Sequence, residues 1–353
     1  MRGQDFEQSS MFCYVSCEQM VPQDHPLRAI RSQADECLKG ISRKLAPLYS
    51  GLGRPSIAPE KLLRALLLQM LYSIRSERLL MEQLRYNFLF RWFIGLSLED
   101  GVWDATVFSK NRDRLLDGDI ARLFFQAVLE QVRKHGLLSD EHFSVDGTLI
   151  EAWASEKSFQ RRPDPPQGGS GARGKVLLHD VFVSGTDPEA RKFKKSRYGD
   201  AKLCHLLHVL MDNRHGIAVN SCVSEATTGA ERKAAIDMLR RTRRKGGRAT
   251  VAADKGFDDR KFVADARKLG VTPHVAQFER RTSSVDRRTT RHVGYTQSLN
   301  RRPRIEQIFS WLKNVAMLRK TRHRGHRKIE WMMNLALSAY NLIRMRKLVP
   351  QVG

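Results

Sequence analysis

Apolar residues recur at helical spacing from about residue 59 to residue 114. After Pro59, leucines and methionines return every three or four positions, which predicts an amphipathic helix that begins near this proline. A second apolar-rich helix is expected over about 78–92, and Asp104 or Thr106 is expected to cap a third. Residues 1–55 mix polar and apolar positions without a clear period, so no element is predicted there.

The pattern changes near His142, where short β-type runs replace the helical period. The run 142–146 is interpreted as a short strand that ends in a carboxylate. Two apolar runs follow over 203–211 and 217–224, and the polar turn 212–216 between them predicts a hairpin.

Strands and helices then alternate towards the end of the chain. The expected elements are a helix over 231–243, a strand over 249–253, a helix over 259–269, a strand over 271–276, a helix that contains Glu306, and a last helix over about 328–347. Strands first and alternation later predict an α/β fold, a mixed sheet with flanking helices in the order of the ribonuclease-H-like fold. We therefore expect an all-helical N-terminal domain over 1–135 and a ribonuclease-H-like domain over 136–353.

The second domain is expected to contain a flexible insertion at about 160–200. Its first half holds three prolines and the glycine-rich run 168–171, followed by basic residues. Such a composition is typical of a loop rather than of a packed core.

Charge indicates the kind of partner. The 353 residues include 62 Lys and Arg against 38 Asp and Glu, a formal net charge of +24 spread through the chain. This excess predicts attraction to a polyanion, of which nucleic acid is the commonest. The basic runs 240–245, 287–291 and 319–324 are candidate phosphate contacts. The helical module that ends near Arg114 is a candidate DNA-binding domain, although its spacing fits an ordinary helical bundle equally well.

No membrane or secretion signal is expected. The longest apolar stretch, 62–74, contains Arg64 and is shorter than the roughly 20 residues needed to span a bilayer. The first ten residues are polar and include acids, which is unlike a signal peptide. We therefore expect a cytoplasmic protein associated with the bacterial nucleoid.

Cysteine and histidine residues are expected to play ordinary structural roles. Cys13, Cys17 and Cys37 lie near His25, but their spacing is a weak zinc signal, and buried reduced thiols are the favoured interpretation. His205 and His208 are interpreted as hydrogen-bonded polar residues rather than as metal ligands.

Two aspartates share a local context that fits a metal site. Asp146 and Asp254 each follow a short apolar strand, and Gly147 and Gly256 stand within two positions of them. A carboxylate at a strand end beside a permissive glycine points into a crevice. Either aspartate alone is more often an ordinary turn residue. Together with a third acid they would hold hard divalent cations, which take oxygen ligands.

Glu306 is the candidate third acid. Arg302, Glu306 and Lys313 are separated by four and seven residues, which places them in one line on a helix. Spacing alone leaves two interpretations open. One is a solvated line of ion pairs worth a few tenths of a kcal/mol, and the other is a metal-binding carboxylate flanked by cations that hold phosphates.

Several ordered motifs carry a family resemblance. They are Val-Asp-Gly-Thr at Asp146, Ala-Asp-Lys-Gly-Phe-Asp at Asp254, and Arg302-x3-Glu306-x6-Lys313, together with the N-terminal segments 53–56 and 106–110 and the segment 151–159. They resemble the bacterial insertion-sequence DDE transposases, more narrowly the group comprising insertion sequence families four and five. The signature of that group has a tyrosine three residues before the arginine, where this chain has Leu299, and its nearest tyrosine is Tyr295.

The resemblance implies a function and a set of site residues. Asp146, Asp254 and Glu306 would bind two Mg²⁺ ions, with Mn²⁺ able to substitute, and Arg302 and Lys313 would contact DNA phosphates. The protein would bind the terminal inverted repeats of its element, cut the DNA and transfer the strand to a target. Because two ends are joined in one complex, a homodimer is expected.

Two other functions remain open on the sequence. A ribonuclease-H-like nuclease would use the same acids only for hydrolysis. A non-catalytic DNA-binding repressor derived from a transposase would not need the acids at all.

Overall fold

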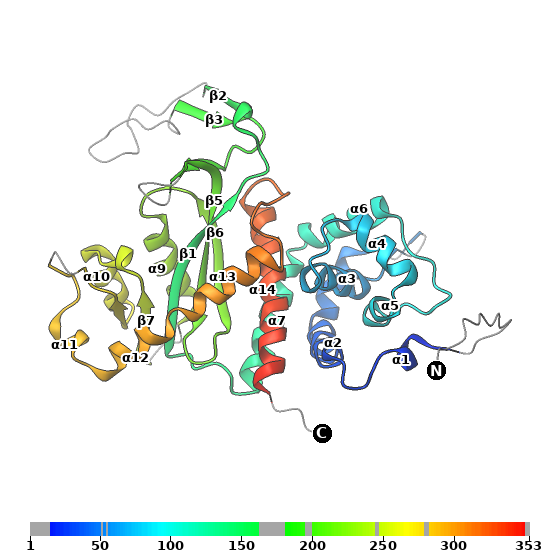
Figure 1. Cartoon of the computed structure of the whole chain (residues 1–353), viewed down its shortest axis with the longest axis horizontal. Helices are drawn as coiled ribbons and strands as arrows, with labels where there is room; N and C mark the ends of the chain where they lie inside the picture. Colours follow the sequence, from blue (N-terminus) through cyan, green and yellow to red (C-terminus); the bar gives the residue numbers. More distant parts are fainter. Residues whose placement is uncertain are drawn as a thin grey trace, which may run out of the picture.

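The computed structural model describes residues 15–50, 52–53, 56–161, 181–194, 200–243, 247–278 and 282–349. A helical part formed by the first third of the chain lies beside a sheet with helices on both of its faces (Figure 1).

Among the described residues, seven α-helices form the N-terminal part. They are α1 (Cys17–Met20), α2 (Pro26–Leu45), α3 (Pro59–Leu71), α4 (Glu77–Tyr86), α5 (Phe88–Ile94), α6 (Ala105–Asp117) and α7 (Ile120–Lys134). The helix expected at Pro59 is confirmed as α3. The expected cap of α6 is confirmed as well, because the Asp104 carboxylate accepts a hydrogen bond from the backbone N–H of Thr106 at 2.7 Å.

Two expectations about these helices are wrong. The single helix expected over 78–92 is divided at Asn87, whose side chain accepts the N–H of Phe90 and so starts α5 as a separate helix. The segment 1–55, for which no element was predicted, contains the 20 residues of α2. The buried side chains of α2 do recur at helical spacing, but the polar residues between them hide the period.

The remainder of the chain alternates strands and helices. Its strands are β1 (His142–Glu151), β2 (Phe159–Arg161), β3 (Phe182–Ser184), β4 (Arg191–Phe193), β5 (Lys202–Asp212), β6 (Ala218–Glu225), β7 (Ala249–Ala253) and β8 (Val271–Val275). Its α-helices are α9 (Ala230–Thr242), α10 (Arg260–Lys268), α11 (Arg287–Thr290), α12 (Val293–Arg301), α13 (Arg304–Asn314) and α14 (His326–Leu348). The hairpin expected around 212–216 is confirmed by β5 and β6.

The strand order confirms the expected fold class. The main sheet has the order β6-β5-β1-β7-β8, with the short β4 on the same edge of β5 as β6. Strand β5 is antiparallel to β1, whereas β7 is parallel to β1 and β8 is parallel to β7. Three antiparallel strands followed by two parallel ones are the arrangement of the ribonuclease-H-like fold.

Alternation along β1 assigns the two faces of this sheet. Phe143 and Val145 pack with Met238 of α9 and Phe262 of α10 in one apolar cluster. Ile150, which points to the other face, packs with the apolar side chains of α13 and α14. Figure 1 shows α13 crossing the sheet on its way to α14. The face that carries Asp146 is therefore the face covered by α12, α13 and α14.

One hydrophobic core joins the helical part to this face of the sheet. It contains buried residues of α2, α3, α7, α13 and α14, among them Leu38, Leu66, Phe124, Ile308 and Leu335. The helical part is therefore packed directly against the helices that position the sheet. No helix in the described ranges is long and apolar enough to cross a membrane.

In its described residues, the expected insertion at about 160–200 contributes the short strands β2, β3 and β4. Strands β2 and β3 pair with each other, and β4 joins the main sheet beside β5. The proline- and glycine-rich stretch 163–171 on which the prediction of flexibility depended lies outside the described residues.

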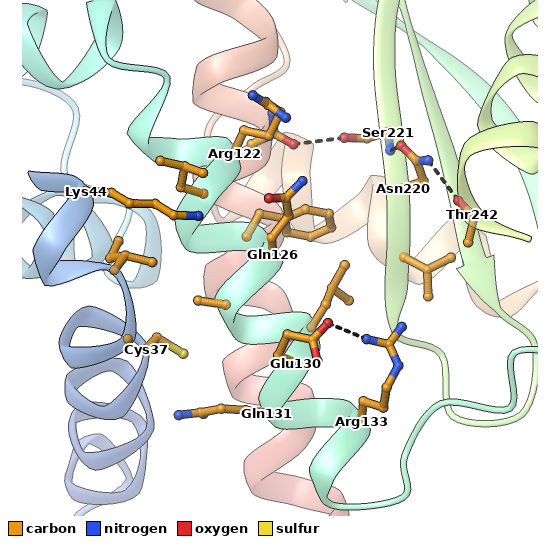
Figure 2. Close-up of a pocket in the computed structure, with 18 of the residues that line it drawn as sticks. Cys37, Lys44, Arg122, Gln126, Glu130, Gln131, Arg133, Asn220, Ser221 and Thr242 are labelled. Atoms are coloured by element: carbon orange, nitrogen blue, oxygen red, sulfur yellow. Dashed lines mark hydrogen bonds and ion pairs between the residues drawn. The ribbon is translucent and has the colours of Figure 1, made fainter. Parts of the chain in front are cut away.

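A cavity of about 740 Å³ lies where α2 and α7 meet the edge strand β6 (Figure 2). Arg133 forms an ion pair with Glu130 at 2.6 Å, and Asn220 donates a hydrogen bond to the Thr242 hydroxyl at 2.8 Å. Cations and acids are mixed in its lining, and burial raises the pKa of the Glu330 carboxyl there. None of the three candidate acids lines this cavity.

Candidate active site

Asp146 lies in the middle of a strand and not at its end. Strand β1 continues for five residues beyond it, and Asp146 pairs with Val209 of β5. The prediction of a strand end is wrong because Gly147 does not make a turn. A Cβ atom at Gly147 would lie 2.9 Å from an oxygen of Glu231 and 3.1 Å from a nitrogen of His208, so the glycine allows a close approach of these side chains.

Asp254 takes the position that was predicted for it. It is the first residue after β7, and its carboxylate accepts the N–H of Lys255 at 2.7 Å. The parallel register of β1 and β7 pairs Ser144 with Ala252, two residues before each aspartate. Asp146 and Asp254 therefore emerge side by side on the same face of the sheet.

Glu306 reaches the same place from a helix. It lies in the first turn of α13, where Ile305, Ile308 and Leu312 are buried in the core. Because these apolar residues fix which side of α13 faces the sheet, Glu306 is left exposed at the rim.

The Arg302 guanidinium lies within 4 Å of all three acids. The residue caps the C-terminus of α12 just before α13, and its guanidinium donates a hydrogen bond to Asp146 at 2.9 Å. It also lies 3.9 Å from an oxygen of Asp254 and 3.7 Å from an oxygen of Glu306. Acids separated by more than 150 residues thus surround one cation.

Lys313 lies farther along the same helix as Glu306. It lies seven residues beyond Glu306, about 10 Å along the helix. Its side chain lines a second cavity of about 660 Å³ between α3, α4 and the segment that follows α13. Trp153, Arg319 and Arg322 line the same cavity, and the Lys320 ammonium lies 5.6 Å from the centre of the Trp153 ring.

The three acids have the donor chemistry that divalent cations require. Three carboxylates on three elements are the oxygen donors that such ions prefer, and they already converge on a positive charge. Within the described ranges no three His, Cys, Asp or Glu side chains stand close enough to hold one ion as they are. The Arg302 side chain lies among the three acids and contacts Asp146 at 2.9 Å. The donor set fits the ions once this arginine gives way.

A polar group missed by sequence reasoning holds Arg302 in place. The buried Asn213, in the turn after β5, donates hydrogen bonds to the Ser144 hydroxyl at 2.9 Å and to the Ser298 carbonyl at 3.2 Å. These bonds tie the start of β1 to α12, four residues before Arg302. The only sequence signal was the polar turn, which indicates a hairpin and says nothing of a contact to α12.

Tyr295 and Leu299 lie in α12. The Tyr295 hydroxyl donates to the Val275 carbonyl at 2.8 Å, and its ring packs edge-on against His274. Tyr295 therefore anchors α12 to the end of β8, and Leu299 is half-buried.

The two histidines of β5 are hydrogen-bonded, as predicted. The buried His205 contacts the Asp187 carboxylate at 3.1 Å, and His208 contacts the Ser224 hydroxyl at 2.8 Å. Cys17 and Cys37 are buried, and burial raises the pKa of the Cys37 thiol to about 12.

Two solved structures resemble this chain at low identity. A piggyBac transposase synaptic complex with hairpin DNA is 9% identical with a TM-score of 0.42, over 91% of this chain and 75% of that chain. A Mos1 mariner paired end complex with Mn is 13% identical with a TM-score of 0.28, over 88% of this chain and 85% of that chain. The assignment of the fold rests on the strand order and not on these likenesses.

Family comparisons are more specific. Residues 15–114 match the model of a transposase domain (DUF772). Residues 138–342, which include β1 and most of α14, match the model of a transposase DDE domain. Because this second match spans more than half of the sequence, the chain belongs to the transposase DDE domain family.

Proposed function

We propose that this protein binds the terminal inverted repeats of its own insertion sequence and cuts and joins DNA there with divalent metal ions. The convergence of Asp146, Asp254 and Glu306 on one guanidinium carries the proposal. Solvated ion pairs along one helix, the alternative that spacing left open, would not gather acids from two strands as well.

The three carboxylates would hold the ions, Mg²⁺ in the cell with Mn²⁺ as a substitute. When bound, two such ions activate the attacking oxygen and stabilise the leaving oxygen of a phosphoryl transfer. Asp146 is the least exposed of the three acids, so it would be the most rigid ligand. Asp254 and Glu306 stand at the rim, where the DNA would arrive.

Arg302 would exchange its partners when DNA binds. A phosphate is an anion that a guanidinium binds with two parallel hydrogen bonds, so a phosphate near the cut can draw Arg302 from the carboxylates. Lys313, farther along α13, would contact the DNA backbone in the cavity that Trp153 and Arg319 also line.

We assign DNA binding to the helical domain, 1–135, and the chemistry to the domain 136–353. A homodimer would bring two element ends together. The protein would act in the cytoplasm, at the nucleoid. The motifs around the three acids support membership of the group comprising insertion sequence families four and five. Tyr295 lies one helical turn before the position of the signature tyrosine.

A strand-transfer assay with pre-cut element ends tests the proposal. Joined products are expected with Mg²⁺, because the free 3′-hydroxyl acts as the nucleophile. Products of cutting without joining would indicate a nuclease instead.

Asp146→Asn tests the metal site itself. Cutting is expected to fall more than about 100-fold, since loss of even an outer partner of a metal ligand costs 10- to 100-fold. Binding of the element ends should be largely retained, because phosphate and base contacts lie elsewhere. Asp237→Asn, a matched change on the surface of α9, should cut at the normal rate. Normal cutting by Asp146→Asn would refute the site, and no cutting by the unaltered protein would indicate a repressor.

A further inference from the structure

A basic cavity of about 890 Å³ lies at the edge of the sheet where the parallel strands begin. His142, Thr250 and Thr272 line it, and they are register partners across β1, β7 and β8. Helices α11 and α12 complete its wall. The cavity and the acids share one face of the sheet, because His142 and Asp146 are four residues apart on the same strand.

The lining of this cavity is strongly positive. Its five arginines are Arg214, Arg248, Arg267, Arg288 and Arg301. The two acids of the lining are already paired, since Glu141 lies 3.3 Å from Arg214 and Asp286 lies 2.6 Å from Arg267. In the part of the chain that the structure describes, the side chains of the other three arginines have no ion pair or hydrogen bond.

Neutral hydrogen-bonding groups form the floor of the cavity. His142 contacts the Thr250 hydroxyl at 3.0 Å, and the buried His274 contacts the Ser298 hydroxyl at 2.8 Å. Burial, with the nearby His142 and His292, lowers the pKa of His274 to about 4, so its ring is uncharged near neutral pH. A concave site with three unpartnered guanidinium groups above a polar floor is suited to phosphate groups.

We propose that this cavity binds backbone phosphates of the same DNA whose scissile phosphate lies at the three acids. The proposal rests on the function proposed above. Four residues of β1 separate His142 from Asp146, which is about 13 Å. One strand of DNA carries a phosphate about every 3.4 Å along the helix axis, so the cavity lies about four nucleotides from the cut.

Two consecutive arginines connect the two sites. Arg301 lines the cavity, whereas Arg302 contacts the acids. A DNA strand bound at both places would therefore contact the protein on either side of the C-terminus of α12. The cavity shown in Figure 2 is a weaker candidate, because acids and cations are mixed in its lining and Glu130 pairs with Arg133.

The test compares the salt dependence of DNA binding for the full chain and for Arg248→Gln/Arg288→Gln. Both side chains are exposed and form no ion pair or hydrogen bond within the described residues. Each lost phosphate contact lowers the slope of log affinity against log salt by about 0.9, so the double variant should lose about 2 from the slope. Arg248→Lys/Arg288→Lys should keep the slope, because lysine binds phosphate as a point charge.

A control variant removes the same charge from the opposite face of the sheet. Lys233→Gln/Lys268→Gln, on α9 and α10, should bind DNA with the slope of the unaltered protein. An equal slope for the Arg248→Gln/Arg288→Gln variant would overturn the proposal. So would an equal loss of slope in both double variants, which would reflect net charge alone.

Tripolyphosphate distinguishes a free anion from DNA. If the arginine variant loses affinity for tripolyphosphate while its DNA slope is unchanged, the cavity serves a soluble phosphate and the proposal is wrong. Failure of the metal site can be distinguished from failure of the cavity proposal. In the first case Asp146→Asn would cut DNA normally, while the arginine variant would still show a reduced salt slope.

Discussion

Arg302 places one positive charge within 4 Å of the three carboxylates of Asp146, Asp254 and Glu306. An arginine at this position has two opposite effects. It keeps three carboxylates close together without a metal, and it competes with any cation that they would bind. Its side chain is only 15% exposed, so its charge is poorly screened by water and both effects are strong.

Removal of this charge should therefore separate metal binding from catalysis. Arg302→Gln is expected to bind Mn²⁺ more tightly than the unaltered protein in the absence of DNA, because the carboxylates lose their internal counter-ion. The same variant should cut DNA more slowly, because a phosphate contact is lost. Titration of free Mn²⁺ by electron paramagnetic resonance measures the first effect, and weaker or unchanged Mn²⁺ binding would show that Arg302 does not compete.

Asn213 is a second single residue that supports the site, by hydrogen bonds that hold two segments together rather than by charge. Asn213→Ala removes the donor to the Ser144 hydroxyl and to the Ser298 carbonyl in a buried region. The free energy of unfolding should fall by about 1–3 kcal/mol, the cost of leaving buried polar groups without a partner. Urea unfolding measures this change. Asn314→Ala, at an exposed position on α13, is the matched control, and an equal loss in both variants would contradict the assignment.

Among the elements, α12 links the candidate active site to the sheet. Ser298 contacts His274 of β8, and Tyr295 donates to the last residue of that strand. The helix is polar and arginine-flanked, so no element was predicted between the strand at 271–276 and the helix that contains Glu306. Contacts between distant segments, rather than any apolar period, stabilise it.

The contact between α12 and β8 should respond to pH. His274 has its pKa lowered to about 4, mainly by burial and further by His142 and His292. As the pH falls from about 6.5 to about 4, this histidine is protonated in the unfolded chain but stays uncharged in the folded protein. The free energy of unfolding therefore decreases over this range. The loss from this group is at most about 3 kcal/mol.

His274→Gln tests this dependence, because glutamine can keep the hydrogen bond to Ser298 and does not titrate. The variant should lose less stability than the unaltered protein between pH 7 and pH 4.5, measured by urea unfolding at each pH. Equal losses would mean that His274 is protonated in the folded state.

Much of the whole molecule could be predicted from local patterns. Strand β7 lies over the predicted residues, α3 begins at the predicted proline, and α9 and α10 lie within one residue of their predicted bounds, because apolar periodicity and turn residues are local signals. Asp254 was placed correctly for the same reason. Asp146 was not, because the length of β1 is determined by its pairing with β5 and not by the glycine beside it.

The grouping of the acids around Arg302 could not be predicted from spacing. It depends on the parallel register of β1 and β7 and on the path of α12 across the sheet. The helical spacing of Arg302 and Glu306 indicated one of the three contacts, and the other two join segments that lie far apart in the sequence. The family resemblance singled out Asp146, Asp254 and Glu306 together, and their convergence on Arg302 supports that choice.

In the whole molecule, the proposed function requires that Asp146, Asp254 and Glu306 jointly hold the metal ions on DNA. Titration of Mn²⁺ into the complex of the protein with an element-end duplex, with free Mn²⁺ followed by electron paramagnetic resonance, tests it most directly. The unaltered complex should bind two ions per active site. Asp146→Asn, Asp254→Asn and Glu306→Gln should each weaken binding at least about tenfold, and Asp237→Asn should not. Unchanged binding in the three acid variants would show that these acids do not hold the ions.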